Sequence, residues 1–471
     1  MWWIYMTLLA AEPGPGPAHP APDTLVTAPL APTDCSGEAC LARGPLTLDA
    51  ETVARLAAQA STSAAHEDGE TRAAAARARA LDQRFLPRVD LQARYTRIAE
   101  EEGGSIDPGI PGVTVTIPGA QPNQWHFGVG VSLPVSDWFL RSDKASEAGR
   151  RAAAASTWKA AAARRRAALD ATLAYWDRVR IGRALAVSNQ TIDDAKARLA
   201  EADKRVRAEV ASTADLELAK VRVAEAELQQ ATLASTQELV EAQLRALLDL
   251  PVAATLTIVD DAAATPEAAP ASAAPATSAA DLAALIADAW RDRPEPRALN
   301  EAEAAYRAEL GLAEVKRLPR FDVVANAQVV NPNPRAFPQK DAFSATWDVS
   351  AVVSWNVNGL WETAPAADEV RAKVLALDAD RRALDDGLRL EIAAALRVLR
   401  DATAKEQSSR AMLAAATEGH RVRTRLYALG KATAVEVAEA ETQLERARLG
   451  LVDAAIDRNV GEARLRYAVG R

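Results

Sequence analysis

The chain of 471 residues contains an internal repeat, and no other feature of the sequence constrains its fold as strongly. RFLPRVDLQA at 84–93 corresponds to KRLPRFDVVA at 316–325, which aligns Pro87 with Pro319 at an offset of 232 residues. Further along, VSLPVSDW begins at 131 and VSWNVNGL begins at 353, an offset of 222. The chain therefore repeats one structural unit, with a slightly shorter connection in the second copy.

The later parts of the two copies keep nearly the same spacing. ASTAD at 211–215 corresponds to ATAVE at 432–436, an offset of 221 residues. Irregular loops would differ more in length between the two copies, so regular structure is expected along most of these segments. The sequence predicts four parts, which are a signal-peptide-like and Pro-rich N-terminus (1–45), a first repeat (46–250), an Ala/Pro-rich linker (251–280) and a second repeat (281–471). Cys35 and Cys40 lie in the first part, where a local disulfide and two reduced thiols remain alternatives.

Apolar and polar residues alternate in four segments, near 88–98, 125–135, 320–330 and 345–356. Ten residues are about the length that a tilted strand needs to cross a membrane, although a half-buried sheet in a soluble protein has the same period. Polar, turn-rich connections favour the membrane reading. So do five tryptophans in or beside the strands, as expected of residues at a membrane interface: Trp125, Trp138, Trp347, Trp355 and Trp361.

Four such strands do not close a barrel, because every strand edge in lipid must be paired. The sequence therefore predicts that several copies share one barrel, with eight strands from two copies or twelve from three. No run of 18 apolar residues is present to form a transmembrane helix.

Long helices should make up the rest of the chain, which is rich in Ala, Arg, Glu and Leu and has only 5% aromatic residues. No proline occurs between Pro134 and Pro251, or between Pro365 and the C-terminus. The first of these segments predicts a helix from about 140 to 208, on the order of 100 Å long. Hairpin tips are expected near residues 210 and 430, followed by returning helices whose apolar stripes pack against other long helices.

Several function classes are excluded by the same sequence. The 56 basic and 64 acidic residues are interspersed, with no basic stripe for nucleic acid. The four histidines are far apart, and no phosphate loop, nucleophile elbow or metal-binding spacing is present. The sequence thus predicts a protein that is not an enzyme and has no metal or other cofactor.

With these residues in place, the chain resembles the TolC-like outer-membrane efflux proteins over about residues 46–471. The most specific matches are LTLDAETVARLA (46–57), the two LPR joints, RPEPRAL (293–299) and the paired tips. The resemblance implies a homotrimer whose twelve-stranded outer-membrane barrel continues into a periplasmic α-helical barrel. It also implies a passive exit duct, gated at its helical tip, in a tripartite efflux or type I secretion system with a periplasmic adaptor and an inner-membrane pump.

The resemblance assigns adaptor docking to the hairpin tips. In the second tip the matching residues are Leu429, Gly430 and Thr433. In the first tip they are Val210 and Ser212, and Glu209 stands where the family usually has glycine.

The resemblance also assigns a gate beside the tips. Glu436 and Glu439 match rings of acids at the closed aperture, and Asp215 and Tyr427 match a carboxylate and a phenol that hold it shut. The arginine that completes this latch is replaced by Ala432, so either Lys431 substitutes for it or the closed state is held more weakly.

A purely structural role remains an alternative for two of these acids. Ser212 with Asp215, and Thr433 with Glu436, have the spacing of a capping box that starts a helix. For the whole protein, a non-pore coiled-coil spacer or a periplasmic adaptor of the cell envelope is the alternative to a duct.

Overall fold

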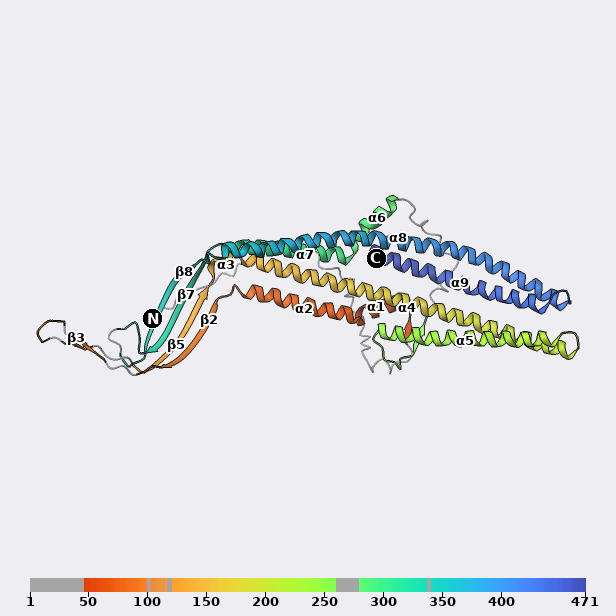
Figure 1. Cartoon of the computed structure of the whole chain (residues 1–471), viewed down its shortest axis with the longest axis horizontal. Helices are drawn as coiled ribbons and strands as arrows, with labels where there is room; N and C mark the ends of the chain where they lie inside the picture. Colours follow the sequence, from red (N-terminus) through yellow and green to blue (C-terminus); the bar gives the residue numbers. More distant parts are fainter. Residues whose placement is uncertain are drawn as a thin grey trace, which may run out of the picture.

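The computed structural model describes residues 46–99, 103–106, 108–112, 114–116, 121–259, 279–336 and 340–471. The N-terminal segment with Cys35 and Cys40, and most of the predicted linker, lie outside the described residues. Figure 1 shows an extended molecule with strands at one end and two helical hairpin tips at the other. The structure is mostly helical, as the sequence predicts, with a small β portion.

Four antiparallel strands form an open sheet in the order β2–β5–β7–β8. Their bounds are Arg88–Arg97 (β2), Asn123–Leu133 (β5), Arg320–Asn331 (β7) and Ser344–Ser354 (β8). A short hairpin of β3 (Ser105–Ile106) and β4 (Val115–Thr116) extends from the connection between β2 and β5. Within the described residues, the outer edges of β2 and β8 have no neighbouring strand.

The long helices continue the order of the strands. Next to the sheet, α4 packs against α2 and α7, and α7 packs against α8; nearer the tips, α5 and α9 take the places of α2 and α7 (Figure 1). The bounds are Thr62–Gln83 (α2), Val135–Leu140 (α3), Ser142–Arg207 (α4), Thr213–Leu247 (α5), Pro294–Val315 (α7), Gly359–Ala428 (α8) and Ala434–Val469 (α9). Among the described residues, no helix is both long and apolar enough to span a bilayer.

Short elements pack against the middle of the long helices at two places. The parallel pair β1 (Leu46–Leu48) and β6 (Leu256–Ile258) and helix α1 (Ala50–Ala60) pack on α4 and α5, and we call this group the belt. Helix α6 (Ala279–Asp292) packs on α8 and α9. The sequence predicts linker throughout 251–280, whereas Leu256–Ile258 pair with the chain just before α1. Apolar alternation over only three residues is too short to reveal such a strand.

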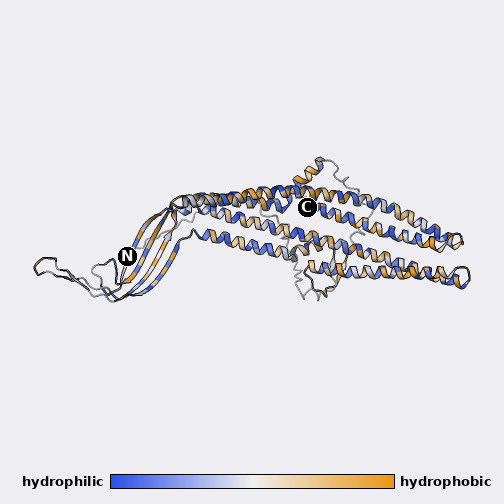
Figure 2. Cartoon of the chain, viewed as in Figure 1, coloured by the Kyte–Doolittle hydropathy of each residue, from blue (hydrophilic) through white to orange (hydrophobic). Residues whose placement is uncertain are grey.

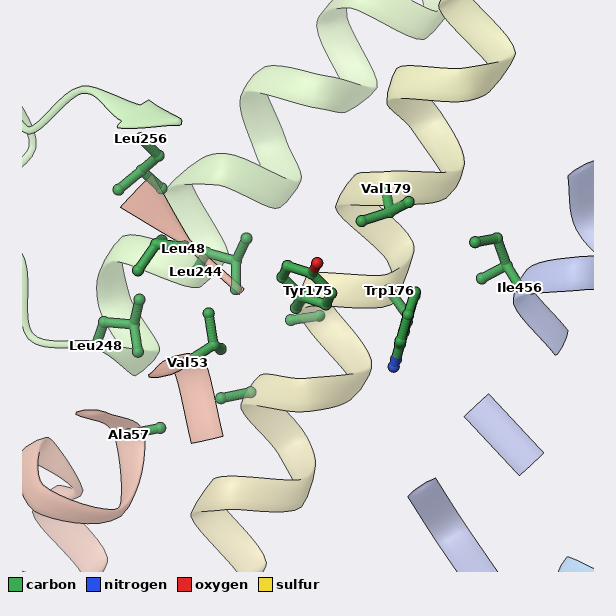
Figure 3. Packing of buried hydrophobic residues seen from close by; sticks show 12 residues of the cluster. Leu48, Val53, Ala57, Tyr175, Trp176, Val179, Leu244, Leu248, Leu256 and Ile456 are labelled. Carbon is green, nitrogen blue, oxygen red and sulfur yellow. The ribbon is translucent and has the colours of Figure 1, made fainter. Parts of the chain in front are cut away.

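The core of this belt is built around two aromatic residues of α4 (Figure 3). Tyr175 is fully buried and faces Val53 and Leu244, while Trp176 lies on the side of α4 toward Ile456. The hydroxyl of Tyr175 donates a hydrogen bond to a carbonyl oxygen beyond β6. This cluster ties the belt to the first hairpin and to α9.

The segment after the linker forms two consecutive helices, α6 and α7. Arg293 has extended backbone angles (φ −76°, ψ 146°), as expected for a residue before proline, and α7 begins at Pro294. The break buries the Arg293 side chain, whose guanidinium binds Glu295 at 2.7 Å and Glu391 at 2.6 Å. Burial alone would lower the pKa of Arg293, but the two carboxylates outweigh it and raise the pKa. RPEPRAL thus joins α6, α7 and α8 near the C-terminus, because Arg293 also donates to the carbonyl oxygen of Ala468.

Candidate functional site

One face of the sheet is apolar and the other is polar. The strand register aligns apolar residues with apolar residues, and polar with polar, across all four strands. One row runs Leu91–Val129–Ala327–Trp347, and the next row on the same face runs Val89–Val131–Ala325–Val349. The intervening row on the opposite face runs Asp90–Gly130–Asn326–Asp348. Figure 2 shows the resulting alternation of colour along each strand.

No other element of the described chain covers the apolar face. Leu91 is 80% exposed, Trp347 76% and Val353 68%. Single exposed apolar residues are common on soluble proteins, but a continuous apolar sheet face indicates a lipid or protein environment. Together with the two open edges, this face is what a wall segment of a lipid-embedded barrel requires.

The five predicted interfacial tryptophans separate into two groups. Trp125 and Trp347 lie toward the loop end of the sheet, where Trp125 contacts Tyr95 with ring centroids 4.5 Å apart. Trp138, Trp355 and Trp361 lie at the helical end, in α3, just after β8 and in α8. Eight residues separate Trp347 from Trp355, about 26 Å along a strand, which at a tilt of about 40° spans roughly 20 Å of the apolar membrane band, about 25 Å tall.

Two of these tryptophans also stabilise the joints between helix and strand. Trp138 Nε1 donates to the carbonyl oxygen of Phe85 at 2.6 Å, and Trp355 Nε1 donates to that of Arg317 at 3.1 Å. Phe85 and Arg317 are separated by the 232-residue repeat offset, so different tryptophans bind equivalent carbonyls.

At the other end of the molecule, the two hairpin tips have the same backbone geometry. Gly430 has φ 69°, and Glu209, at the equivalent position, has φ 59°. The amide of the next residue bonds back in each tip, from Val210 to Arg205 at 3.0 Å and from Lys431 to Leu426 at 2.8 Å. The glutamate thus takes the left-handed conformation that glycine adopts more easily. The predicted tip residues Val210 and Leu429 are 74% and 65% exposed.

Both predicted capping boxes are present. The Ser212 hydroxyl accepts from the amide of Asp215 at 3.3 Å, and the Asp215 carboxylate accepts from the amide of Ser212 at 3.2 Å. Thr433 and Glu436 make the equivalent pair at 3.3 and 2.8 Å. Glu439 lies one turn further on and is exposed. Asp215 and Glu436 therefore have a structural role in starting α5 and α9, and this role is compatible with gating.

Asp215 and Tyr427 line one small cavity of about 50 Å³ between the two hairpins. No hydrogen bond joins these two described side chains within one chain. Instead, Arg205 of the first hairpin places its guanidinium 4.5 Å from the centre of the Tyr427 ring and donates to the Tyr427 carbonyl oxygen at 3.3 Å. An arginine thus contacts the predicted latch, but it comes from the other hairpin.

A charged contact between the hairpins forms part of the wall of the same cavity. Arg198 on α4 binds the Glu441 carboxylate at 2.6 Å and the Thr424 hydroxyl at 2.8 Å, and His420 Nε2 lies 3.8 Å from Glu441. Burial alone would raise the pKa of Glu441, but the nearby His420 and the Arg198 guanidinium outweigh burial, so the pKa lies below its usual value. We call Arg198, Glu441 and Thr424 the tip clamp.

A second charged contact links the hairpins nearer the belt. Arg180 on α4 binds Asp457 on α9 at 2.9 Å, and Lys405 on α8 binds the same carboxylate at 2.7 Å. Polar contacts therefore hold the two hairpins of one chain together near the belt as well as near the tips.

Comparison with known proteins relates part of the chain to a protein family. Residues 54–249 match the model of the family described as outer membrane efflux protein. Over these residues the chain is similar to outer membrane efflux proteins. That family is a class of transport proteins without enzymatic activity. No curated protein matches the chain by sequence.

Solved structures share the fold of this chain along most of its length. VceC of Vibrio cholerae has 16% identity and a TM-score of 0.68, over 89% of this chain and 96% of that one. MtrE of Neisseria gonorrhoeae has 17% identity and a TM-score of 0.68, over 89% and 88%. The outer-membrane channel OprN has 16% identity and a TM-score of 0.69, over 89% of each chain. These similarities concern the fold.

The sequence does not predict the tip clamp. Arg198 and Glu441 are 243 residues apart and lie in different repeats. Each belongs to a charged helical surface in which many residues have similar surroundings. These two residues meet because of the register of α4 against α9. The sequence pattern does not indicate that register.

Proposed function

We propose that three copies of this chain form an outer-membrane exit duct, with a twelve-stranded barrel that continues into a helical tube in the periplasm. The observation that carries the proposal is the sheet, which has an uncovered apolar face, a polar face and two unpaired edges. Three copies pair all the edges, place the apolar face against lipid and enclose the polar face as a lumen. A non-pore spacer would have no use for such a sheet.

The flanking helices support the same assembly. Exposed apolar side chains follow the outer sides of α5 and α8, where no long helix of the described part of the same chain lies beside them. They include Val221, Leu228 and Leu239 on α5, and Leu375, Leu390 and Met412 on α8. A ring of copies buries α5 of one subunit against α8 of the next, which continues the pairing of β2 with β8 into the periplasm.

In this proposal the duct is passive, and an inner-membrane pump supplies the driving force. A periplasmic adaptor docks on the tips, through the exposed side chains of Val210 and Leu429 and the adjoining Ser212, Gly430 and Thr433. Tight turns with small residues allow close approach of a partner helix. The protein therefore resides in the outer membrane of a Gram-negative-type envelope and extends into the periplasm.

The gate lies at the same end of the duct. Three-fold symmetry would turn Glu436 and Glu439 into rings of carboxylates around the axis, which favour cations. Asp215 and Tyr427 hold the closed arrangement across helix interfaces, and the tip clamp keeps the two hairpins of each chain together. Opening is a rearrangement of the tip helices that breaks these contacts.

Electrophysiology of the purified protein tests the duct. Detergent-extracted protein from outer-membrane fractions should insert into planar bilayers and give discrete conductance steps. A water-soluble protein that needs no detergent and never conducts would refute the proposal.

The gate has its own test. Asp215→Ala combined with Tyr427→Phe should raise single-channel conductance, because both latch groups are removed. Ser212→Ala is the matched control, since it removes the capping hydroxyl but leaves the Asp215 carboxylate. If the control raises conductance as much as the double variant, the effect comes from capping and the latch assignment is wrong.

A further inference from the structure

The connection after β7 folds back over the polar face of the sheet. Residues 332–336, which we call the strap, bind two side chains on that face. Asn333 Nδ2 donates to Ser344 Oγ at 2.6 Å, and Arg335 Nη2 donates to Asp348 Oδ1 at 2.7 Å. Val330, on the same face, is only 4% exposed although most of the sheet is open. The strap therefore lies on the polar face and not beyond the end of the strands.

Arg335 brings a positive charge to a row that otherwise contains acids. Asp348 and Asp90 occupy the two edge strands of this row, with Gly130 and Asn326 between them. Asn326 Nδ2 also donates to Asp348 Oδ2 at 3.1 Å. Among the described residues Asp90 has no ion-pair partner, so with Arg335 in place each subunit contributes one unpaired carboxylate to the row, and without it each contributes two.

We infer that Arg335 determines the ion selectivity of the outer part of the duct by neutralising Asp348 on the luminal face. This inference rests on the proposed function, because it needs the polar face to enclose a lumen. Three copies place three such pairs around the lumen, where rings of charged side chains set the preference for cations or anions. The guanidinium also eases the passage of anionic cargo past the Asp90 carboxylates.

The reversal potential of single channels in a KCl gradient measures this selectivity. Arg335→Ala should raise the ratio of potassium to chloride permeability by about twofold or more at an ionic strength of about 0.01 M, where the screening length is about 30 Å. The shift should disappear near 1 M, where that length is about 3 Å. Arg335→Lys should keep the parent ratio, and Arg335→Ala with Asp348→Asn should return to it, because each preserves the charge of the pair.

Arg97→Ala is the matched control. Arg97 is an exposed arginine at the same end of the sheet, but the alternation places it on the apolar face. The control removes the same charge outside the lumen and should leave the ratio unchanged. Conducting channels whose ratio is the same in Arg335→Ala and the parent, or shifts equally in Arg97→Ala, would overturn this inference alone. A parent protein that forms no channel would overturn the proposed function and the inference with it.

Discussion

Replacing Arg198 with alanine should favour the open state at the helical tips. The side chain joins the hairpins through a 2.6 Å bond to the Glu441 carboxylate and a 2.8 Å bond to Thr424. Hydrogen bonds involving charged groups contribute about 1.5–3 kcal/mol. Because Arg198 and Glu441 retain 24% and 19% of their side-chain exposure, the low end applies. A loss of about 1.5 kcal/mol shifts a two-state equilibrium about tenfold, if the clamp exists only in the closed state.

Single-channel recording in planar bilayers measures this shift as the ratio of time spent open to time spent closed. Arg198→Ala should raise the ratio about tenfold, and Glu441→Gln should act in the same direction. Arg397→Ala is the control, because Arg397 and Asp401 form an ion pair on α8 with side chains 83% and 71% exposed, and exposed pairs contribute little. If Arg198→Ala and Arg397→Ala have the same ratio as the parent, the clamp does not hold the closed state.

Three other perturbations probe the sheet, the tips and the clamp. Leu91→Arg should destabilise the barrel by about 2–4 kcal/mol, because it places a charge on the lipid face, and should reduce the amount of heat-resistant oligomer in outer-membrane fractions. Gln92→Arg, on the polar face, should leave that amount unchanged. Equal losses of oligomer in the two variants would contradict the assignment of the faces. Glu209→Gly should stabilise the first tip by about 1 kcal/mol, and Gly430→Ala should destabilise the second tip by a similar amount. Amide hydrogen exchange at the tips measures both changes. Unchanged exchange in both variants would contradict the left-handed backbone geometry. The folded protein lowers the pKa of Glu441 from 4.5, so the clamp stabilises the closed state above that pH and weakens as the pH falls below it. The fraction of time spent open should therefore rise in acid. A Glu441→Gln variant with the same pH dependence would exclude this carboxylate as the cause.

Periodic features of this protein can be predicted from sequence because each depends on neighbours along the chain. Alternation locates β2 near 88–98, against the observed Arg88–Arg97. Absence of proline and helix-forming composition predict a helix at 140–208, against Ser142–Arg207. The capping boxes at Ser212 and Thr433 follow from spacing alone and are present.

Features that depend on contacts between distant segments were missed. The tip clamp needs the register of α4 against α9, which no local pattern contains. The polar, proline-rich segment around Arg335 predicts a loop, but only its bonds to Ser344 and Asp348 place it on the polar face of the sheet. The conformation of Glu209 is also not predictable from the residue itself, because glutamate rarely adopts a left-handed backbone. The backbone hydrogen bonds of the tip hold it there.

The number of chains in the membrane-extracted particle tests the central claim most directly. Native mass spectrometry of protein released from outer-membrane fractions in mild detergent should give a mass of three chains, the number that supplies twelve strands and pairs every β2 edge with a β8 edge. A particle of one chain would contradict the account, because one open sheet of four strands leaves unpaired edges that lipid does not tolerate.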